Sequence, residues 1–376
     1  MADAPIRLGM VGGGGDAFIG AVHRIAARLD GHYTLVAGAL SSTPEKARAS
    51  AGALGLPRSY DSFAAMAEGE AGREDGIEAV AIVTPNHVHA EAAIAFLDRG
   101  IHVICDKPLT ATLEQAEALA KAARRSDALF VLTHNYTGYP MVRQAREMVA
   151  DGLLGTLRVV QAEYAQDWMA GAAEGKQAEW RMDPERSGMG GAIGDIGTHA
   201  YNLACFVSGL TLESLSADLQ AFGEGRVLDD NAHMMLRWQG GARGMLWCSQ
   251  VATGNENALR LRLYGDKGGL EWEQEEPNRL WFTPLGEPKR LLTRNGAGAS
   301  AANTAASRVP GGHPEGYLEG FANIYTDAAR AILSRRRGEA VPDGLLYPTL
   351  EDGLAGMRFV AACVRSSRDN GAWVTP

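Results

Sequence analysis

The chain has 376 residues and a formal net charge of −9, with charges of both signs scattered along its length. This length exceeds one ordinary compact core and fits two domains, each able to bury a substantial apolar interior. The acidic balance disfavours nucleic acid and membrane surfaces as partners, and no apolar run approaches the roughly 20 residues that span a bilayer, so a small uncharged ligand fits better.

The cysteines and the first residues of the chain indicate its compartment. The four cysteines lie far apart and form no Cys-x-x-Cys pair, which favours neither a zinc knuckle nor a disulfide framework. A few polar residues lead directly into a strand-like segment at 6–11, and no basic segment with a following apolar stretch precedes it. We therefore expect a cytoplasmic protein with reduced thiols.

The first third of the chain has the rhythm of an α/β domain. From residue 6 to about 132, short apolar runs alternate with amphipathic stretches, which is the pattern of βαβ units building a parallel sheet. Thr112 and Gln115 have the spacing of a capping box and predict the start of a helix. We expect a Rossmann-like parallel sheet over residues 1–135. Its expected strands are 8–11, 33–40, 79–84, 101–105 and 129–133.

The first expected strand ends in a run of glycines that leads directly into an amphipathic helix. Such a turn lets backbone N–H groups and the positive end of the helix meet a pyrophosphate without interference from Cβ atoms. Five residues rather than two separate Gly14 from Gly20, so we interpret the turn as a lengthened dinucleotide fingerprint, with a plain glycine-rich turn as the alternative. The residues expected to bind a dinucleotide here are Gly12, Gly14, Asp16, Phe18, Ile19 and Gly20.

The end of the second expected strand carries small hydroxyls where an acidic residue would usually hold the adenosine ribose. Ser41 and Ser42 can bond either a ribose or a 2′-phosphate, and Lys46 and Arg48 are near enough in sequence to assist with a phosphate. NAD and NADP therefore both stay open as the cofactor. Alternatively, Ser42 or its neighbour Thr43 caps the helix that follows.

Polar residues also follow the third and fourth expected strands, at the sheet edge where open α/β sheets bind ligands. Thr84, Pro85 and Asn86 follow one strand, although Asn86 can instead cap a helix. Asp106 and Lys107 follow the next. A lysine partly desolvated beside a cationic nicotinamide loses its proton more readily and can relay a proton to or from a substrate hydroxyl, whereas the alternative is an ordinary surface lysine.

After about residue 136 the rhythm changes to that of an open sheet. We expect a second α/β domain over residues 136–376 with a large, mostly antiparallel sheet, whose open face is a plausible docking surface, and with closing helices that can pack back on the first domain. The glycine-, alanine- and serine-rich segment 295–312 fits a mobile surface loop or a substrate lid. The expected elements are a helix at 140–149, a strand at 157–168, hairpins turning at 239–241 and 265–269, and closing helices at 315–335 and 350–367.

Within this second part, a glycine-rich loop runs into a helix that carries Asp195 and His199. Residues four apart project from one helical face, so a histidine that takes a hydroxyl proton and an aspartate that orients it or the substrate can work together. Taken singly, Asp195 fits a helix-dipole partner and His199 a core histidine. No third ligand with supporting spacing accompanies the pair, so we expect no metal site.

These residues together resemble the Gfo/Idh/MocA family of NAD(P)-dependent sugar and cyclitol oxidoreductases. The resemblance implies NAD or NADP bound between a Rossmann domain and a C-terminal α/β domain with a large open sheet, through which relatives commonly pair into dimers or tetramers. The motifs that carry it are Gly20-x-x-His23, Thr84-Pro85-Asn86-x-x-His89, Cys105-Asp106-Lys107-Pro108, Glu179-Trp180-Arg181 and Gly194-Asp195-x-x-x-His199.

The resemblance also implies roles for particular residues. Lys107 and His199 would carry acid/base chemistry with Asp195 assisting, and His89, Trp180 and Arg181 would join the cofactor site. Asp106 departs mildly from the family's usual glutamate. Beyond these residues, His313 precedes the first closing helix and is a candidate substrate contact, with a loop histidine of no special role as the alternative.

Three functions of different classes follow from these expectations. The favoured one is a dehydrogenase that passes a hydride between NAD(P) and a secondary hydroxyl of a sugar, glycoside or inositol-type cyclitol. The second is an NAD-dependent glycoside hydrolase that oxidises its substrate transiently. The third is a non-catalytic sensor that binds a dinucleotide. The residues expected to contact substrate are Lys107, Asp195, His199 and His313.

Overall fold

The computed structural model describes residues 4–15, 17–171 and 183–376 of the chain, which folds into two compact units. The first unit consists of Met1–Asn135 and Leu318–Leu354, and the second of Tyr136–Tyr317 and Ala355–Pro376. The second unit is therefore interrupted in sequence by a segment that belongs to the first. None of the helices among the described residues has the length and apolar character needed to cross a membrane.

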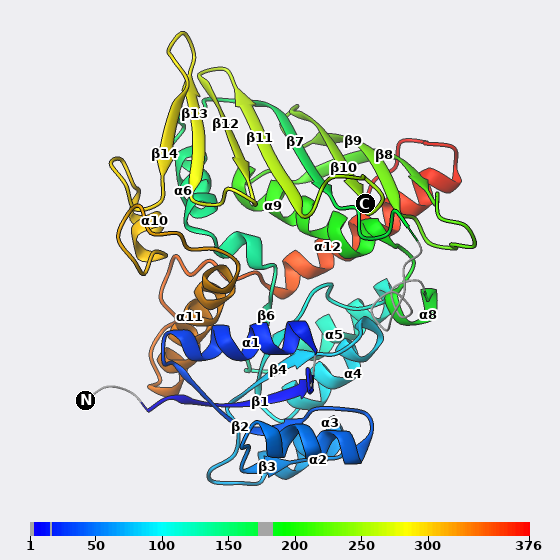
Figure 1. Ribbon diagram of the computed structural model, residues 1–376, viewed down its shortest axis with the longest axis vertical. Coiled ribbons are helices and arrows are strands. Elements are labelled where there is room, and N and C mark those ends of the chain that lie inside the picture. Colours follow the sequence, from blue (N-terminus) through cyan, green and yellow to red (C-terminus); the bar gives the residue numbers. More distant parts are fainter. Residues whose placement is uncertain (1–3, 16, 172–182) are drawn as a thin grey trace. The chain divides into compact units, whose positions relative to one another are not determined.

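The first unit is built on a six-stranded sheet in which every neighbouring pair is parallel, so the predicted Rossmann-like sheet is confirmed (Figure 1). All five residues of its central strand β4 are buried, as expected for a sheet covered on both faces. From one edge to the other the strands are β3 (Arg58–Ser59), β2 (Tyr33–Ala39), β1 (Ile6–Gly12), β4 (Ala79–Val83), β5 (His102–Cys105) and β6 (Phe130–Leu132).

The strand order reverses between β1 and β4, so the chain moves outward in opposite directions from the centre of the sheet. Because crossovers between parallel strands are right-handed, the helices of the two halves lie on opposite faces. The capping box predicted at Thr112 and Gln115 is present and begins α5. The late helix α11 packs on α1, where the ring of Phe321 lies 5.1 Å from that of His23. The helices of this unit are α1 (Phe18–Leu29), α2 (Pro44–Ala53), α3 (Phe63–Ala71), α4 (Asn86–Leu97), α5 (Leu113–Ala123) and most of α11 (Tyr317–Arg336).

The second unit is built on an eight-stranded sheet, which is antiparallel except for the pair β7 and β10. The predicted mostly antiparallel sheet is thus confirmed, including both hairpins. The long first strand ends at Ala165, three residues earlier than the sequence predicts. In spatial order the strands are β14 (Arg290–Thr293), β13 (Arg279–Pro284), β12 (Gly268–Glu273), β11 (Ala258–Gly265), β7 (Leu157–Ala165), β10 (Arg243–Ser249), β9 (Asn231–Trp238) and β8 (Leu212–Gln220).

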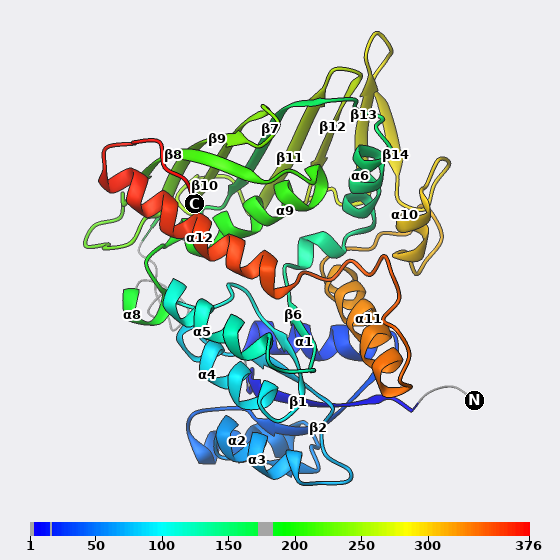
Figure 2. The same cartoon turned by 180° about the vertical axis from the view of Figure 1, so that it is seen from behind.

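One face of this sheet carries the core of the second unit, with helices α6, α9 and α12 packed on it (Figure 2). Trp238 is fully buried there, whereas Met235 and Trp281 on the other face are 56% and 40% exposed. The remaining elements are η1 (Asn135–Gly138), α6 (Pro140–Ala150), α8 (Pro184–Ser187), η2 (Ile193–Gly197), α9 (Thr198–Ser208), α10 (Ala301–Ala305) and α12 (Leu350–Arg368).

The segment 295–312, expected to be a mobile loop or a lid, is anchored by buried polar side chains. Arg294 and Glu315 flank it and form an ion pair at 3.0 Å, with both side chains 2% exposed. Inside the segment, helix α10 presents Asn303, whose side-chain amide donates to Gln144 at 2.7 Å. Burying a charged pair is tolerated only when its polar atoms are largely satisfied. Moving the segment would break these buried contacts, so they anchor it to the rest of the unit.

Candidate functional site

The glycine turn after β1 has a backbone that only glycine accommodates. Gly12 and Gly13 adopt φ values of +76° and +69°. A Cβ on Gly12 would lie 2.7 Å from the carbonyl oxygen of Val83, and one on Gly14 would lie 2.6 Å from that of Leu40. The turn is therefore packed tightly against the residues that end β4 and follow β2, and without side chains it leaves only backbone at the carboxyl end of β1, where a dinucleotide fingerprint places the pyrophosphate.

The same turn is fastened to helix α1. A Cβ on Gly20 would collide with the backbone of Gly13, so the third glycine of the fingerprint acts by allowing close packing of helix and turn. The Arg24 guanidinium donates to the carbonyl of Gly13 at 2.5 Å. Phe18 is 61% exposed at the first position of α1, whereas Ile19 is half-buried. Asp16 lies outside the described residues.

Small hydroxyl side chains follow β2, as the sequence indicates. Ser41 accepts a hydrogen bond from the Thr43 backbone N–H at 3.1 Å, and Ser42 is exposed. Thr43 occupies the N-cap position of α2 but makes no capping hydrogen bond with its side chain. Arg48 forms ion pairs with Asp61 at 2.8 Å and with a glutamate of its own helix, so its charge is already engaged.

The end of β4 contains a polar atom that the protein itself leaves unsatisfied. Among the described residues, the buried Thr84 hydroxyl has no hydrogen-bond partner. Pro85 takes the N-cap position of α4, so Asn86 becomes the first helical residue rather than the cap. His89 is fully buried with its ring nitrogens 2.9 Å from the carbonyls of Pro108 and Thr84. His89 thus joins two loops at this edge, which suits a positioning role.

Asp106 and Lys107 follow β5 in a partly buried, polar setting. Asp106 accepts from the backbone N–H of Lys107 at 2.8 Å and from the Thr133 hydroxyl at 3.1 Å. Burial acts to raise the pKa of Asp106, but His23, with its Nε2 3.9 Å away, and Lys107 outweigh it and keep that pKa below its usual value. Burial and the charge of Lys107 lower the pKa of His134 to about 3, so this neighbour stays neutral.

In the second unit, Asp195 lies in a π-helical turn, η2, rather than in the regular helix that the sequence predicts. A π-helical turn is wider than an α-helical one, so it changes the angle between Asp195 and His199 from the one that regular helical spacing gives. His199 follows in the next helix, α9, and π turns are frequent at functional sites. Gln250 donates to the Asp195 carboxylate at 2.9 Å, and His199 is only 7% exposed. Across the described ranges, no group of three His, Cys, Asp or Glu side chains is arranged to hold a metal ion.

A second aspartate holds the start of the Asp195 turn. The Asp229 carboxylate accepts from the backbone N–H groups of Gly191 at 2.7 Å and Ile193 at 2.8 Å. A Cβ on Gly191 would collide with the Asp229 carbonyl, which explains why a glycine stands here. Burial is the main reason that the pKa of Asp229 rises to about 6, although these hydrogen bonds oppose the rise.

Aromatic and amide side chains that the sequence did not single out surround His199. The ring of Tyr136 lies 4.9 Å from the imidazole in an edge-to-face arrangement, and that of Tyr164 lies 6.2 Å away. The two hydroxyls are 2.6 Å apart, and Asn257 completes the cluster by accepting from Tyr164 at 2.7 Å. The only sequence signal was Tyr136 at the change of rhythm, because the three residues lie far apart in the chain.

For three of the predicted contact residues, the structure does not show whether they reach a ligand. Trp180 and Arg181, expected near the nicotinamide, lie outside the described residues, as does the Glu179 of their motif. His313 is exposed, and its carbonyl accepts a hydrogen bond from the buried Arg294. The substrate-contact role of His313 stays a prediction.

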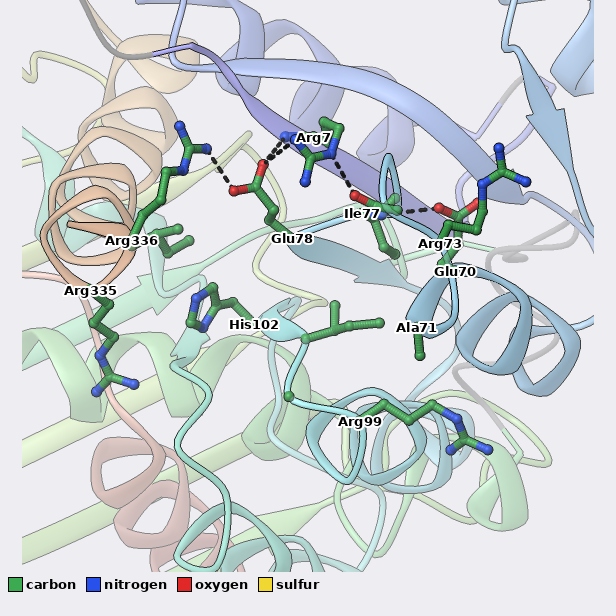
Figure 3. A pocket seen from close by; sticks show the side chains of 14 residues that line it. Arg7, Glu70, Ala71, Arg73, Ile77, Glu78, Arg99, His102, Arg335 and Arg336 are labelled. Carbon is green, nitrogen blue, oxygen red and sulfur yellow. Dashed lines mark hydrogen bonds and ion pairs between the residues drawn. The ribbon is translucent and has the colours of Figure 1, made fainter. Parts of the chain in front are cut away.

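The amino end of the same parallel sheet has a cavity of about 350 Å³ with a different character (Figure 3). Part of its charge is paired within the lining: Glu78 accepts from the backbone N–H of Arg7 at 3.0 Å and pairs with Arg336 at 2.8 Å. Because Arg336 ends α11, these contacts fasten that helix to the start of β1 and β4. The lining residues include Arg7, Glu70, Arg73, Glu78, Arg99, His102, Arg335 and Arg336.

Comparison with known proteins defines the class. Residues 6–134 match the oxidoreductase family with an NAD-binding Rossmann fold, and residues 142–271 match the GFO/IDH/MocA C-terminal domain. The chain therefore belongs to the Gfo/Idh/MocA family of oxidoreductases. The predicted family, its enzyme class and a nicotinamide dinucleotide as the cofactor are confirmed at this level.

Two solved structures cover nearly the whole chain, and a curated relative covers about three quarters of it. The crystal structure of an oxidoreductase from Sinorhizobium meliloti is 64% identical, with a TM-score of 0.91 over 99% of this chain and 100% of that one. An inositol dehydrogenase homolog from Azotobacter vinelandii, solved with NADH and myo-inositol, is 37% identical, with a TM-score of 0.94 over 99% and 98%. Levoglucosan dehydrogenase of Pseudarthrobacter phenanthrenivorans is 28% identical over 73% of this chain and 75% of its own.

Proposed function

We propose that this oxidoreductase is an NAD(P)-dependent dehydrogenase that acts on a secondary hydroxyl of a sugar, glycoside or inositol-type cyclitol. The relatives that support this substrate class are named for an inositol and for an anhydro sugar, both of them rings with several hydroxyls. The observation that carries the proposal is the pair Asp195 and His199 in a buried polar cluster, with Asp195 held by Gln250 and His199 against two tyrosines.

The cofactor part of the proposal rests on the carboxyl edge of the first unit. Gly12 and Gly14 would receive the pyrophosphate at their bare backbone, and the unsatisfied hydroxyl of Thr84 would bond the dinucleotide. Ser41 and Ser42 would contact the adenosine ribose or a 2′-phosphate, which leaves NAD and NADP as alternatives. When bound, the nicotinamide supplies the hydride acceptor.

The chain's own groups would manage the proton. We assign His199 the role of taking the hydroxyl proton as the carbon gives up a hydride and the alcohol becomes a ketone. Asp195, whose carboxylate Gln250 orients, would hold the imidazole or a neighbouring substrate hydroxyl. Lys107, as a protonated amine, would donate a hydrogen bond from Nζ to the reacting oxygen and so act as the acid partner, while the single hydroxyl proton goes to His199. Such a positioned acid or base contributes about 10²- to 10⁴-fold to the rate.

A two-cofactor activity screen tests the proposal. The protein is incubated with NAD or NADP and a panel of cyclitols, aldopyranoses, glycosides and anhydro sugars, and the absorbance of the reduced nicotinamide is followed. At least one polyol should give turnover that depends on His199. If the protein binds a dinucleotide yet neither oxidises these polyols nor reduces the matching ketones, the proposed function is wrong.

We also propose that the enzyme assembles into a homodimer or homotetramer through the uncovered face of the eight-stranded sheet. Met235 and Met245 are cross-strand neighbours on this face and expose 56% and 40% of their surfaces, and Trp281 on β13 exposes 40%. Exposed apolar side chains of this size on one sheet face suit an interface. Analytical ultracentrifugation should give a mass of two or four chains. Replacing Met235 and Trp281 with charged residues should return the mass of a single chain.

A further inference from the structure

Three side chains from distant segments close a ring of hydrogen bonds beside His199. The hydroxyl of Tyr136, in η1, lies 2.6 Å from that of Tyr164, in β7. Tyr164 lies 2.7 Å from Oδ1 of Asn257, just before β11, and Nδ2 of Asn257 returns to the Tyr136 hydroxyl at 3.4 Å. Each member of the ring can therefore donate one hydrogen bond and accept another.

Two residues outside the ring, Trp168 and Gln166, determine which member donates and which accepts in each hydrogen bond of the ring. Trp168 can only donate, and its Nε1 lies 3.1 Å from Oε1 of Gln166. The amide nitrogen of Gln166 must then face Asn257, where the bond at 2.7 Å requires an accepting oxygen. Tyr164 therefore donates to that oxygen and has no second proton to give. The 2.6 Å contact must be a donation from Tyr136 to Tyr164.

The ring holds two aromatic side chains against the imidazole. The planes of Tyr136 and Tyr164 stand at 72° and 61° to that of His199, at centroid distances of 4.9 and 6.2 Å. Such edge-to-face contacts define the plane of a buried imidazole. Burial raises the pKa of Tyr136, so its phenol stays neutral, and its proton is already committed to Tyr164.

We propose that Tyr136, Tyr164 and Asn257 are positioning residues that orient the imidazole of His199 and take no part themselves in proton exchange with the substrate hydroxyl. The proposal rests on the proposed dehydrogenase function and names the residues that set its proton acceptor. Breaking the ring would free the aromatic side chains to shift and let water reach His199. Water favours the charged imidazole, so the midpoint of its titration would rise.

Tyr136→Phe tests the proposal because it keeps the aromatic ring and removes only the hydroxyl. Loss of one hydrogen bond is expected to raise the titration midpoint of His199, followed by NMR without substrate, by about half to one pH unit. Turnover should fall about tenfold, and the pH profile of kcat should move with the midpoint, while dinucleotide affinity stays the same. The matched control is Tyr264→Phe on the outer face of the same sheet, which should change none of these quantities.

Asn257→Ala provides a second test if the Tyr136 variant does not fold, because Asn257 is only partly buried. It should raise the His199 midpoint in the same direction. A midpoint equal to the wild-type value in either folded variant overturns the positioning role. The two proposals separate cleanly: a wild-type protein without dehydrogenase activity refutes the proposed function, whereas the titration of His199 still reports on the ring.

Discussion

The two edges of the parallel sheet in the first unit differ in how their polar groups are satisfied. At the amino edge, a cavity of about 350 Å³ gathers five arginines, yet Glu78 is bound by Arg7 and Arg336, and Glu70 is held by Arg58 at 2.6 Å (Figure 3). At the carboxyl edge, the glycine turn offers bare backbone and Thr84 keeps a buried hydroxyl without a protein partner among the described residues.

This difference shows that the number of charges is a poor guide to function. A charged group that is paired within its own chain contributes to folding stability and has little left to offer a ligand. A buried polar atom without a partner costs free energy unless a ligand completes it, and a native protein keeps such an atom for a reason. The contrast predicts that changes at the carboxyl edge alter binding and catalysis, whereas changes at the amino edge alter stability alone.

The largest expected effect comes from Lys107→Ala at the carboxyl edge. Removing the amine should lower kcat by about 10²- to 10⁴-fold with little change in dinucleotide affinity, because the lysine acts on the reacting oxygen and the glycine turn holds the cofactor. Steady-state kinetics and a fluorescence titration of the reduced dinucleotide measure the two quantities. The control at the other edge is Arg336→Ala, which should cost about 1 kcal/mol of stability and leave kcat intact. Equal losses of kcat in both variants would mean that the two edges of the sheet do not differ in their contribution to catalysis.

Gly12→Ala addresses the glycine turn rather than the chemistry. Its Cβ would stand 2.7 Å from the Val83 carbonyl on a backbone with φ of +76°, so the turn must change its shape. We expect dinucleotide affinity to fall about 10- to 100-fold, which corresponds to about 1.4 to 2.8 kcal/mol. Gly100→Ala is the matched control, since Gly100 has a φ of +72° but open space around its Cβ. It should cost about 1 kcal/mol of stability and leave dinucleotide affinity unchanged.

Much of this architecture follows from local sequence pattern. Alternating apolar runs predicted both sheets, whereas the joint role of Asp195 and His199, expected from their spacing, stays a prediction. The glycine turn was recognisable despite its extra length because it stands between the first strand and the first helix. These features depend on short-range periodicity and on glycine's freedom of φ, which a single sequence displays directly.

Other features depend on contacts between distant residues and were beyond reach. The sequence allowed the closing helices to pack back on the first domain, but the amphipathic pattern of α11 does not reveal that it meets α1, with Phe321 against His23. The ring around His199 joins residues from three separate segments, and no spacing connects Tyr164 with Asn257. The segment 295–312 has the composition of a loop, but its course is fixed by the buried pair Arg294 and Glu315.

His102 provides a pH test of the amino edge. Burial, followed by the charge of Arg335, lowers its pKa from 6.5 to about 4. The unfolded chain then binds the proton more tightly, so stability is present above pH 6.5 and is lost as the pH falls towards 4, by about 3 kcal/mol. In His102→Asn this loss should vanish, which urea unfolding of both proteins across that range measures. An unchanged acid slope, or altered dinucleotide affinity at neutral pH, would count against the assignment of this edge to stability.

Asp229 provides a corresponding pH test in the second unit, where stability is expected to fall as the pH rises rather than as it falls. Its carboxylate is satisfied by backbone N–H groups of its own chain, so by the same rule it should act on stability although it lies beside the Asp195 turn. Burial raises its pKa from 3.8 to about 6, so the native state binds the proton more tightly and stability is lost as the pH rises from about 4 to 6.

Asp229→Asn removes this titration. The stability of the variant minus that of the wild type should therefore increase by about 3 kcal/mol between pH 4 and pH 7, a slightly smaller change than for His102. Urea unfolding at the two pH values gives this difference directly, because groups that titrate in both proteins cancel. Dinucleotide affinity should stay the same, since Asp229 belongs to the second unit and the glycine turn to the first. A difference that does not change with pH would mean that the carboxylate is charged throughout and that its hydrogen bonds outweigh its burial.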